Sequence, residues 1–61
     1  MVLLICMNNG ENFTFEITEE NYKTFKMDSL IYQWLKLNDY GCKTDTEVII
    51  RKENISYYGL V

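Results

Sequence analysis

The pattern of apolar and polar residues in the first third of the chain predicts a β-hairpin. Positions 2–7 are uninterrupted apolar residues, which is typical of a strand that is covered on both faces or lies in an interface. Along positions 12–17 apolar and polar residues alternate, as they do in a strand that buries one face. Asn9 and Gly10 lie between the two segments, and this pair favours a tight primed turn because both residues tolerate a positive φ. We therefore expect residues 2–7 to pair with residues 12–17.

Helical periodicity follows, in two phases. Thr18 can cap a helix, and the two glutamates after it suit the positive end of the helix dipole. A second apolar stripe, which contains Trp34, does not line up with the first. We expect either one kinked helix or two short helices, at about 19–26 and 29–38, with Trp34 on the buried side. Gly41 then fits a left-handed helix terminator.

The last third of the chain has the composition of further strands. β-Branched and aromatic residues are frequent along positions 48–58. The inward-facing positions change parity across residues 51–54, so either a turn or a bulge lies there. With a turn, residues 47–51 and 55–60 form a second hairpin.

These elements add up to one small α+β domain over residues 1–61. We expect an antiparallel sheet of three to four strands, in the order ββαβ or ββααββ, with one kinked or two short helices packed on one face. By surface scaling, burial contributes about 90 kcal/mol, and ordering the chain costs about 90 kcal/mol. Because these free energies nearly cancel, we expect further stability from self-association, as a small homo-oligomer, or from a partner.

The apolar run at positions 2–7 also raises the question of targeting. A secretion signal needs a basic region, a longer apolar stretch and a small-residue cleavage site. This run has none of these, and a lipoprotein cleavage box at residues 3–6 would leave no room for the segment that must precede it. No span approaches the roughly 20 apolar residues of a membrane helix. We therefore expect a cytoplasmic protein without membrane association, with Cys6 and Cys42 reduced.

Composition argues against several classes of function. The chain has six basic and nine acidic residues and a net charge of −3, whereas binding to nucleic-acid phosphates needs clustered Lys and Arg. The absence of histidine excludes the usual catalytic triad, and together with the presence of only two cysteines it excludes a structural zinc site. The three glycines are isolated, so there is no glycine-rich phosphate loop. We expect no enzyme activity, no cofactor and no metal site.

The two cysteines have different surroundings. Cys6 lies in the apolar run and has the character of a small core residue. Cys42 lies in an expected loop beside Lys43, which could lower the pKa of its thiol. A reactive Cys42 and an inert, partly buried Cys42 both remain open.

Four residues are candidates for a binding interface: Tyr40, Arg51, Tyr58 and Leu60. Tyrosine and arginine are enriched at interface hot spots. Tyr57 and Tyr58 face opposite sides of a strand, so one packs inward while the other is presented. With Tyr58 outward beside Leu60, the last strand becomes a sheet edge or an oligomer seam.

Three features of the chain are shared with one group of proteins. They are the strand–Asn-Gly–strand opening, the helix start Thr-Glu-Glu-Asn-Tyr and the tail Val-Ile-Ile-Arg-Lys-Glu-Asn-Ile-Ser-Tyr-Tyr. Together they resemble small uncharacterised proteins of phages and mobile elements in low-GC Gram-positive bacteria. The resemblance covers most of the chain and implies an accessory role in the host cytoplasm, because compact phage proteins often bind and disable a host factor, including nuclease-based or signal-dependent immunity.

Three hypotheses for the function remain. The first is an accessory protein of a phage or mobile element that binds and inhibits a host protein, for example in host defence, as a small oligomer. The second is an oligomer that binds or sequesters a nucleotide signal, with Arg51, Lys52 and the tyrosines facing the ligand. The third is a weak nucleic-acid-binding module that uses aromatic residues on a sheet, which the net charge opposes.

Overall fold

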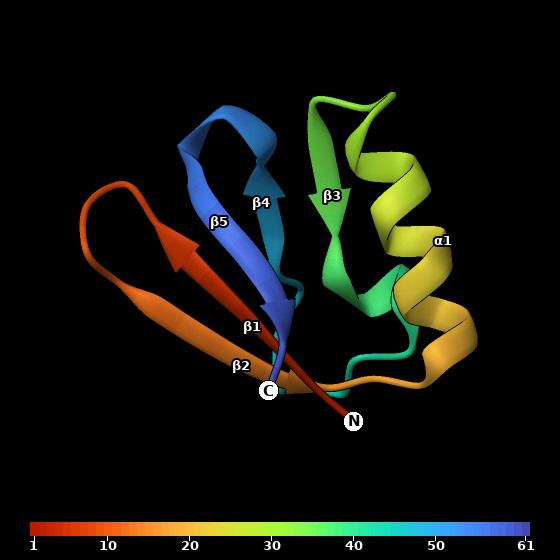
Figure 1. The fold of residues 1–61 in the computed structure, drawn as a ribbon. Coiled ribbons are helices and arrows are strands. Elements are labelled where there is room, and N and C mark those ends of the chain that lie inside the picture. Colours follow the sequence, from red (N-terminus) through yellow and green to blue (C-terminus); the bar gives the residue numbers. More distant parts are fainter.

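The computed structural model describes residues 1–61, which form two small antiparallel sheets and one α-helix (Figure 1). The elements in chain order are β1 (Val2–Met7), β2 (Asn12–Glu16), α1 (Glu19–Ser29), β3 (Trp34–Lys36), the 3-10 helix η1 (Leu37–Tyr40), β4 (Ile49–Arg51), the 3-10 helix η2 (Lys52–Asn54) and β5 (Ile55–Leu60). The first sheet has the strand order β2-β1-β5, and the second pairs β3 with β4. The α+β class expected from the sequence is confirmed.

The β-hairpin expected at the start of the chain is also confirmed. β1 and β2 pair antiparallel, with Leu3 opposite Phe15. Their connection differs from the expected primed turn, because Gly10 alone has a positive φ, of 92°. The Gly10 N–H donates to the Met7 carbonyl at 3.0 Å, and the Met7 N–H donates to the Glu11 carbonyl at 2.8 Å. The loop therefore has three residues, with glycine at the position that requires it.

The start of α1 follows the sequence prediction. Thr18 is the N-cap, and its side-chain oxygen accepts a hydrogen bond from the Asn21 N–H at 3.1 Å. The helix ends in a tight turn, where the N–H groups of Ile31 and Tyr32 both donate to the Asp28 carbonyl, at 3.0 and 2.8 Å. α1 has 11 residues, and no helix in the chain is long and apolar enough to cross a lipid bilayer.

The second helix expected at residues 29–38 is wrong. This stretch forms a turn, β3 and η1 instead. In β3, Leu35 is fully buried, whereas Trp34 points outward with 61% of its surface exposed, which is the alternation of a strand. Leu35 lies opposite Ile50 of β4, and both belong to the core. The apolar spacing fits a helix, but pairing with β4 buries Leu35 and Ile50 together and so favours the strand.

The second hairpin, expected from residues 47–51 and 55–60, does not form either. β4 pairs with β3, and β5 pairs antiparallel with β1. η2 carries the chain from one sheet to the other. The register of β5 also shifts where β1 passes from Cys6 to Met7. The turn expected at residues 51–54 is therefore present as η2, without the hairpin, whereas the register irregularity lies later, between Ile55 and Tyr57 of β5.

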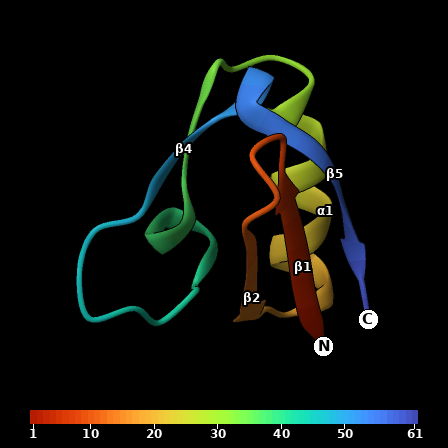
Figure 2. The ribbon, with the colours of Figure 1, turned by 90° about the vertical axis from the view of Figure 1, so that its left-hand side faces the viewer.

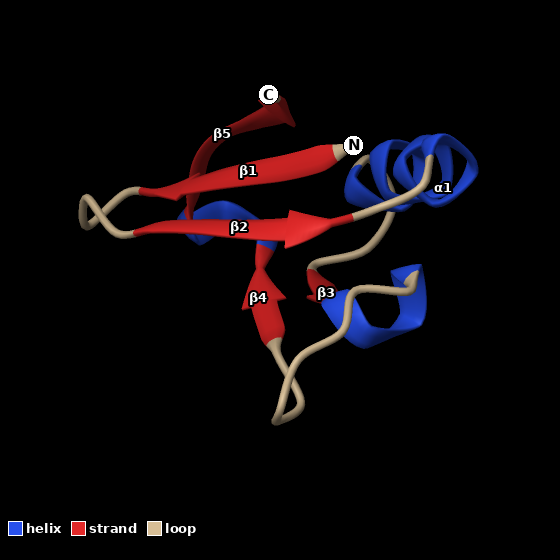
Figure 3. Ribbon diagram, turned by 90° about the horizontal axis from the view of Figure 1, so that it is seen from below, coloured by secondary structure: helices blue, strands red, loops and turns tan.

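One face of the first sheet carries the rest of the molecule. α1 lies behind β1 and β5, and the second sheet lies on the β2 side (Figures 2 and 3). Phe25 of α1 packs edge-on against Tyr58 of β5 and Tyr40 of η1, with ring centroids 5.0 and 5.3 Å apart. The hydrophobic core joins all these elements and consists of Leu3, Ile5, Ile17, Phe25, Leu35, Leu37, Tyr40, Cys42 and Ile50.

The opposite face of the first sheet, which we call the open face, is not covered by any element of the chain (Figure 2). Val2 and Leu4 of β1 are half-buried on this face. Cys6 is buried there, opposite the exposed Tyr57 of β5. Only one face of the central strand therefore meets the core.

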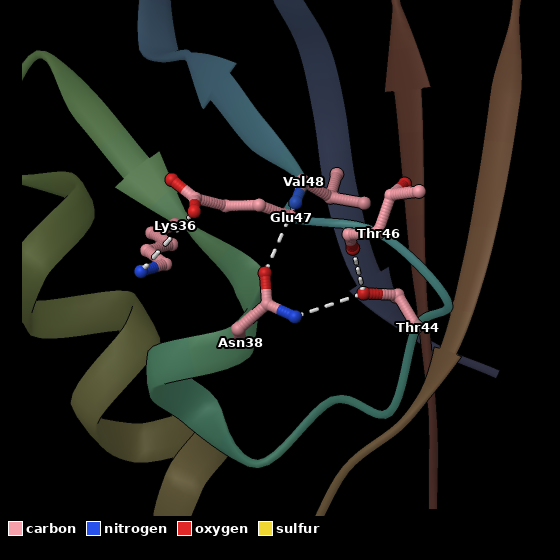
Figure 4. Close-up of polar contacts among 6 residues, drawn as sticks. All are labelled: Lys36, Asn38, Thr44, Thr46, Glu47 and Val48. Carbon is pink, nitrogen blue, oxygen red and sulfur yellow. Dashed lines mark hydrogen bonds and ion pairs between the residues drawn. The ribbon is translucent and has the colours of Figure 1, made fainter.

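A single amide side chain ties the long segment between η1 and β4 to the fold (Figure 4). Asn38 donates to the Thr44 hydroxyl at 2.9 Å and accepts from the Val48 N–H at 3.0 Å. The Thr44 hydroxyl donates in turn to the Thr46 carbonyl. These bonds position Val48 so that its carbonyl accepts from the Leu37 N–H at 2.9 Å. They therefore fix the point where the chain enters β4.

Candidate functional site

Exposed apolar side chains gather where α1 ends and β3 begins. Leu30, which caps the helix, has 80% of its surface exposed, more than any other large hydrophobic residue. The turn after it is ordered, because the Lys52 N–H donates to the Gln33 carbonyl at 2.7 Å and ties the turn to η2. We call this surface the end patch and define it as Leu30, Ile31, Tyr32, Trp34 and Arg51.

Arg51 lies over the indole ring of Trp34. The two residues are opposite each other in the β3–β4 ladder, and the guanidinium carbon is 5.7 Å from the ring centroid. Arg51 Nη2 also lies 2.9 Å from Glu53 Oε1. A cation over an exposed indole contributes about 0.5–1 kcal/mol. The pair therefore orients two exposed side chains without burying either.

A groove runs between α1 and β5, next to the end patch. It consists of two hollows of about 370 and 420 Å³, and Leu30 and Tyr58 line both. Tyr58 is held in place by a hydrogen bond of 2.7 Å between its hydroxyl and that of Ser29. Besides Leu30 and Tyr58, the lining of this α1–β5 groove consists of Lys23, Lys26 and Met27 in one hollow and Ser29, Lys52, Ile55, Ser56 and Tyr57 in the other.

The two tyrosines of β5 have the opposite orientation to the one expected. Tyr58 points inward, where its ring meets Phe25 at 5.0 Å and Tyr22 at 6.4 Å between centroids. Tyr57 points outward on the open face. The register explains the difference, because Tyr58 lies opposite the fully buried Ile5 and shares its face.

Tyr40, a candidate for the interface by its residue type, lies in the core with 6% of its surface exposed. Its hydroxyl donates to Asp28 Oδ2 at 2.7 Å. Burial, together with this hydrogen bond and the carboxylate charge of Asp28, raises the pKa of Tyr40 far above its ordinary value. The folded chain therefore does not present this ring to a partner.

Arg51 and Leu60 are exposed, as surface candidates should be. Arg51 belongs to the end patch, whereas Leu60 lies near the end of β5, opposite Leu3. The spacing of Leu30, Ile31 and Trp34 assigns them to a buried helical stripe, so the sequence does not predict them as surface residues, and Tyr32 is not among its candidates either. One signal could have identified them: three consecutive large apolar residues, 30–32, cannot all face one side of a helix.

Cys42 is buried, with 3% of its surface exposed, and burial raises the pKa of its thiol. A reactive cysteine needs a lowered pKa and access to solvent. Of the two alternatives left open by the sequence, the structure therefore favours the inert thiol over the activated one.

The largest hollow, of about 610 Å³, lies between β2 and the start of α1. Glu16 and Lys43 bring opposite charges to its lining. Gly41, with φ of 74°, approaches Asn21 so closely that a Cβ at position 41 would lie 2.7 Å from Asn21 Nδ2. Thr18, also in the lining, caps α1. These contacts serve the local fold, so we assign no ligand to this hollow.

No family model, curated protein or solved structure matches the chain.

Proposed function

We propose that this chain is a small accessory protein that binds and inhibits a host protein through the end patch. The observation that carries the proposal is the cluster of exposed Leu30, Ile31, Tyr32 and Trp34, with Arg51 stacked on the tryptophan. Scattered single apolar residues are normal on a surface, but contiguous patches mark interaction sites. Tryptophan, tyrosine and arginine are also the residue types that dominate interface hot spots.

The shape and charge of the end patch favour a protein over the two alternative ligands. The exposed side chains project from a turn and a strand end rather than lining an enclosed pocket, whereas small-molecule sites are concave and bury most of the ligand. Arg51 is the only basic residue of the patch. A phosphate ligand would need several free cations.

Two further features support an accessory role for an assembled form of the chain. The resemblance of the sequence to phage and mobile-element proteins supports a host protein as the partner and inhibition as the outcome. The open face, with Val2 and Leu4 half-buried, supports self-association through the first sheet. In an oligomer that forms through the open face, the end patch remains accessible to a partner, because it lies at the far end of α1 and on β3.

The test compares variants of the end patch with a matched control. Trp34→Ala and Leu30→Ser should each weaken binding to a captured host protein by about 30-fold or more, the effect of a hot spot of about 2 kcal/mol. Ile49→Ala is the control. Ile49 is also an exposed apolar residue of the β3–β4 ladder, but it pairs with Lys36 and does not belong to the end patch. Capture on the tagged chain from a host lysate identifies the partner, and titration of the purified partner gives the affinities.

Thermal unfolding of each variant separates loss of binding from loss of fold. The proposed function is supported if Trp34→Ala and Leu30→Ser unfold cooperatively, within about 8 °C of the wild type, but lose the partner and reduce its inhibition, while Ile49→Ala retains both. It is contradicted if the purified partner binds both patch variants with wild-type affinity, or if binding leaves the partner's activity unchanged.

A further inference from the structure

The outer edge of β5 has backbone groups that no strand uses. The Val61 N–H donates to the Val2 carbonyl at 3.0 Å, so position 61 directs its backbone toward β1. In an antiparallel ladder the backbone N–H and C=O groups of successive residues point alternately toward and away from the neighbouring strand. Tyr57 and Gly59 therefore also face β1, while Tyr58 and Leu60 direct their N–H and C=O groups away from it. β5 is the last strand of its sheet, and no element lies beyond it in either side view (Figures 2 and 3).

The α1–β5 groove lies beside this free edge. Its two hollows share Leu30 and Tyr58, so they adjoin each other: one lies along residues 55–58 of β5, and the other extends from Tyr58 toward Lys23 and Lys26 of α1. An added strand would place alternate side chains on the groove side, about 7 Å apart. Two adjoining hollows next to an unpaired edge are the arrangement by which peptides add to a sheet, with the backbone giving affinity and the pockets giving specificity.

The charge of the groove is opposite to the charge of the whole chain. Lys23, Lys26 and Lys52 line it and no carboxylate does, although the chain has nine acidic residues and a net charge of −3. Lys23 lies 3.7 Å from Glu19 in an exposed pair, and Lys26 lies 5.6 Å from the ring centroid of Tyr22. Neither contact neutralises the groove, because exposed pairs of this kind contribute little and exchange readily with solvent.

We propose that an extended, acidic segment of another protein adds to β5 as a fourth strand of the first sheet. Its backbone pairs with Tyr58 and Leu60. Its acidic side chains, which alternate along the strand, face the groove and meet Lys26 and Lys52, whereas its apolar side chains lie on the open face beside Tyr57. The proposal rests on the proposed function, because the segment belongs to the protein partner. Leu30 lies in both the end patch and the groove, so one partner can contact both surfaces.

A second copy of this chain fits the edge less well. Pairing β5 with β5 would bring the three groove lysines of one copy toward those of the other, and like charges oppose such an interface. Pairing β5 with β2 of a second copy would be heterologous, so it would continue from copy to copy into a ring or an open filament. An acidic segment meets neither obstacle.

The direct test uses a synthetic peptide of four glutamate–valine repeats, blocked at both ends, added to the isotope-labelled chain. We expect shifts and slower hydrogen exchange of the Tyr58 and Leu60 amides, and binding at least tenfold tighter than that of the corresponding lysine–valine peptide. The affinity should fall as salt is raised. Equal binding of both peptides, shifts confined to β2, or displacement of the acidic peptide by millimolar nucleotide would overturn the proposal.

Two sets of variants test the same edge. Leu60→Pro removes an N–H that β1 does not use, and Thr14→Pro is its control, because residue 14 occupies the corresponding outward position on β2. We expect at least fivefold weaker binding for Leu60→Pro alone. If Leu60→Pro unfolds, the surface variant Lys26→Glu with Lys52→Glu replaces it and should bind the lysine–valine peptide better than the acidic one.

Failure of strand addition can be told apart from failure of the proposed function. If the acidic peptide does not bind, and the captured partner is lost in Trp34→Ala but retained in the lysine double variant, the end patch is a binding site and strand addition is wrong. If the peptide binds as described but Trp34→Ala retains the partner, strand addition stands and the end patch is not the site.

Discussion

At the scale of single residues, the hydroxyl of a tyrosine decides which of two environments it occupies. A buried tyrosine needs a partner for its O–H. Tyr40 finds one in Asp28 Oδ2 at 2.7 Å, and Tyr58 finds one in the Ser29 hydroxyl at 2.7 Å. Tyr57 points to the open face instead and stays exposed. Both partner groups come from the last turn of α1, so the position of this helix determines which tyrosines pack inside the fold.

The bond between Tyr40 and Asp28 makes a prediction about stability and pH. Tyr40→Phe should lower the free energy of unfolding at neutral pH by about 1–2 kcal/mol, since it leaves Asp28 without its donor. The pKa of Tyr40 is raised in the folded chain, so the native state keeps this proton at a pH where the unfolded chain, with a tyrosine pKa of about 10, has lost it. The contribution of Tyr40 is therefore complete below about pH 10 and decreases as the pH rises further, by up to about 1.4 kcal/mol per pH unit.

Urea unfolding of the wild type and Tyr40→Phe at about pH 7, 9 and 11 measures this contribution. The difference in stability between the two proteins should shrink from about pH 9 to about pH 11. A difference that stays constant over this range would show that the hydroxyl does not keep its proton in the folded chain.

The sequence predicts the types of residue at the candidate surface better than their positions. Arg51 and Leu60 are exposed as expected, because charged residues and residues at strand ends are seldom buried. Tyr40 and Tyr58 could not be placed, because their burial depends on acceptors that lie 12 and 29 residues away along the chain. Spacing within one segment carries no information about such partners.

At the scale of elements, local signals predicted well and pairing signals did not. The hairpin and the Thr18 cap depend on neighbours within a few residues, and both are confirmed. β3 and β4 each have three residues and acquire their conformation from each other. A strand of three residues is too short to show a clear alternation of apolar and polar positions, so the helical spacing of its apolar residues, which arises by chance, predicts a helix at residues 29–38 instead.

Because buried and exposed residues alternate in β3, substitutions at two adjacent positions should lower the stability by very different amounts. Leu35→Ala removes a fully buried side chain and should cost about 2–5 kcal/mol, which would unfold most of a chain of this size. Trp34→Ala removes an exposed ring and its contact with Arg51, and should cost at most about 1 kcal/mol. Thermal unfolding followed by circular dichroism distinguishes the two. A larger loss for Trp34→Ala than for Leu35→Ala would contradict the strand and favour the buried helical stripe.

At the scale of the whole molecule, one sheet face is left without a second layer. The core occupies one side of the first sheet, and the open face exposes Tyr57 and the edges of Val2 and Leu4. A chain of 61 residues buries only about 60% of the surface that its unfolded form exposes, so its stability is marginal. Stacking two open faces would bury apolar area that a single chain cannot.

We expect the chain to self-associate through the open face and one substitution there to make it monomeric. The wild type should sediment as a dimer or larger oligomer, with a midpoint of thermal unfolding that rises with protein concentration. Leu4→Glu places a charge at the centre of the open face and should give a monomer with a lower, concentration-independent midpoint. Thr24→Glu, at an exposed position of α1 and therefore on the other side of the sheet from the open face, is the control and should assemble like the wild type. A wild-type chain that stays monomeric at millimolar concentration would refute the prediction.

The pairing of β5 with β1 also has a consequence for the time course of folding. It joins the two ends of the chain, which lie side by side in Figure 1, with Val61 bonded to Val2. Closing a loop of about 50 residues costs about 3.5 kcal/mol in chain entropy. The hairpin and α1 need no such closure and can form within microseconds, whereas the three-stranded sheet is complete only after the slower pairing of β5 with β1. Until β5 arrives, the inner edge of β1 is itself unpaired, so a partner strand that reaches the chain early could compete for that edge with the chain's own last strand.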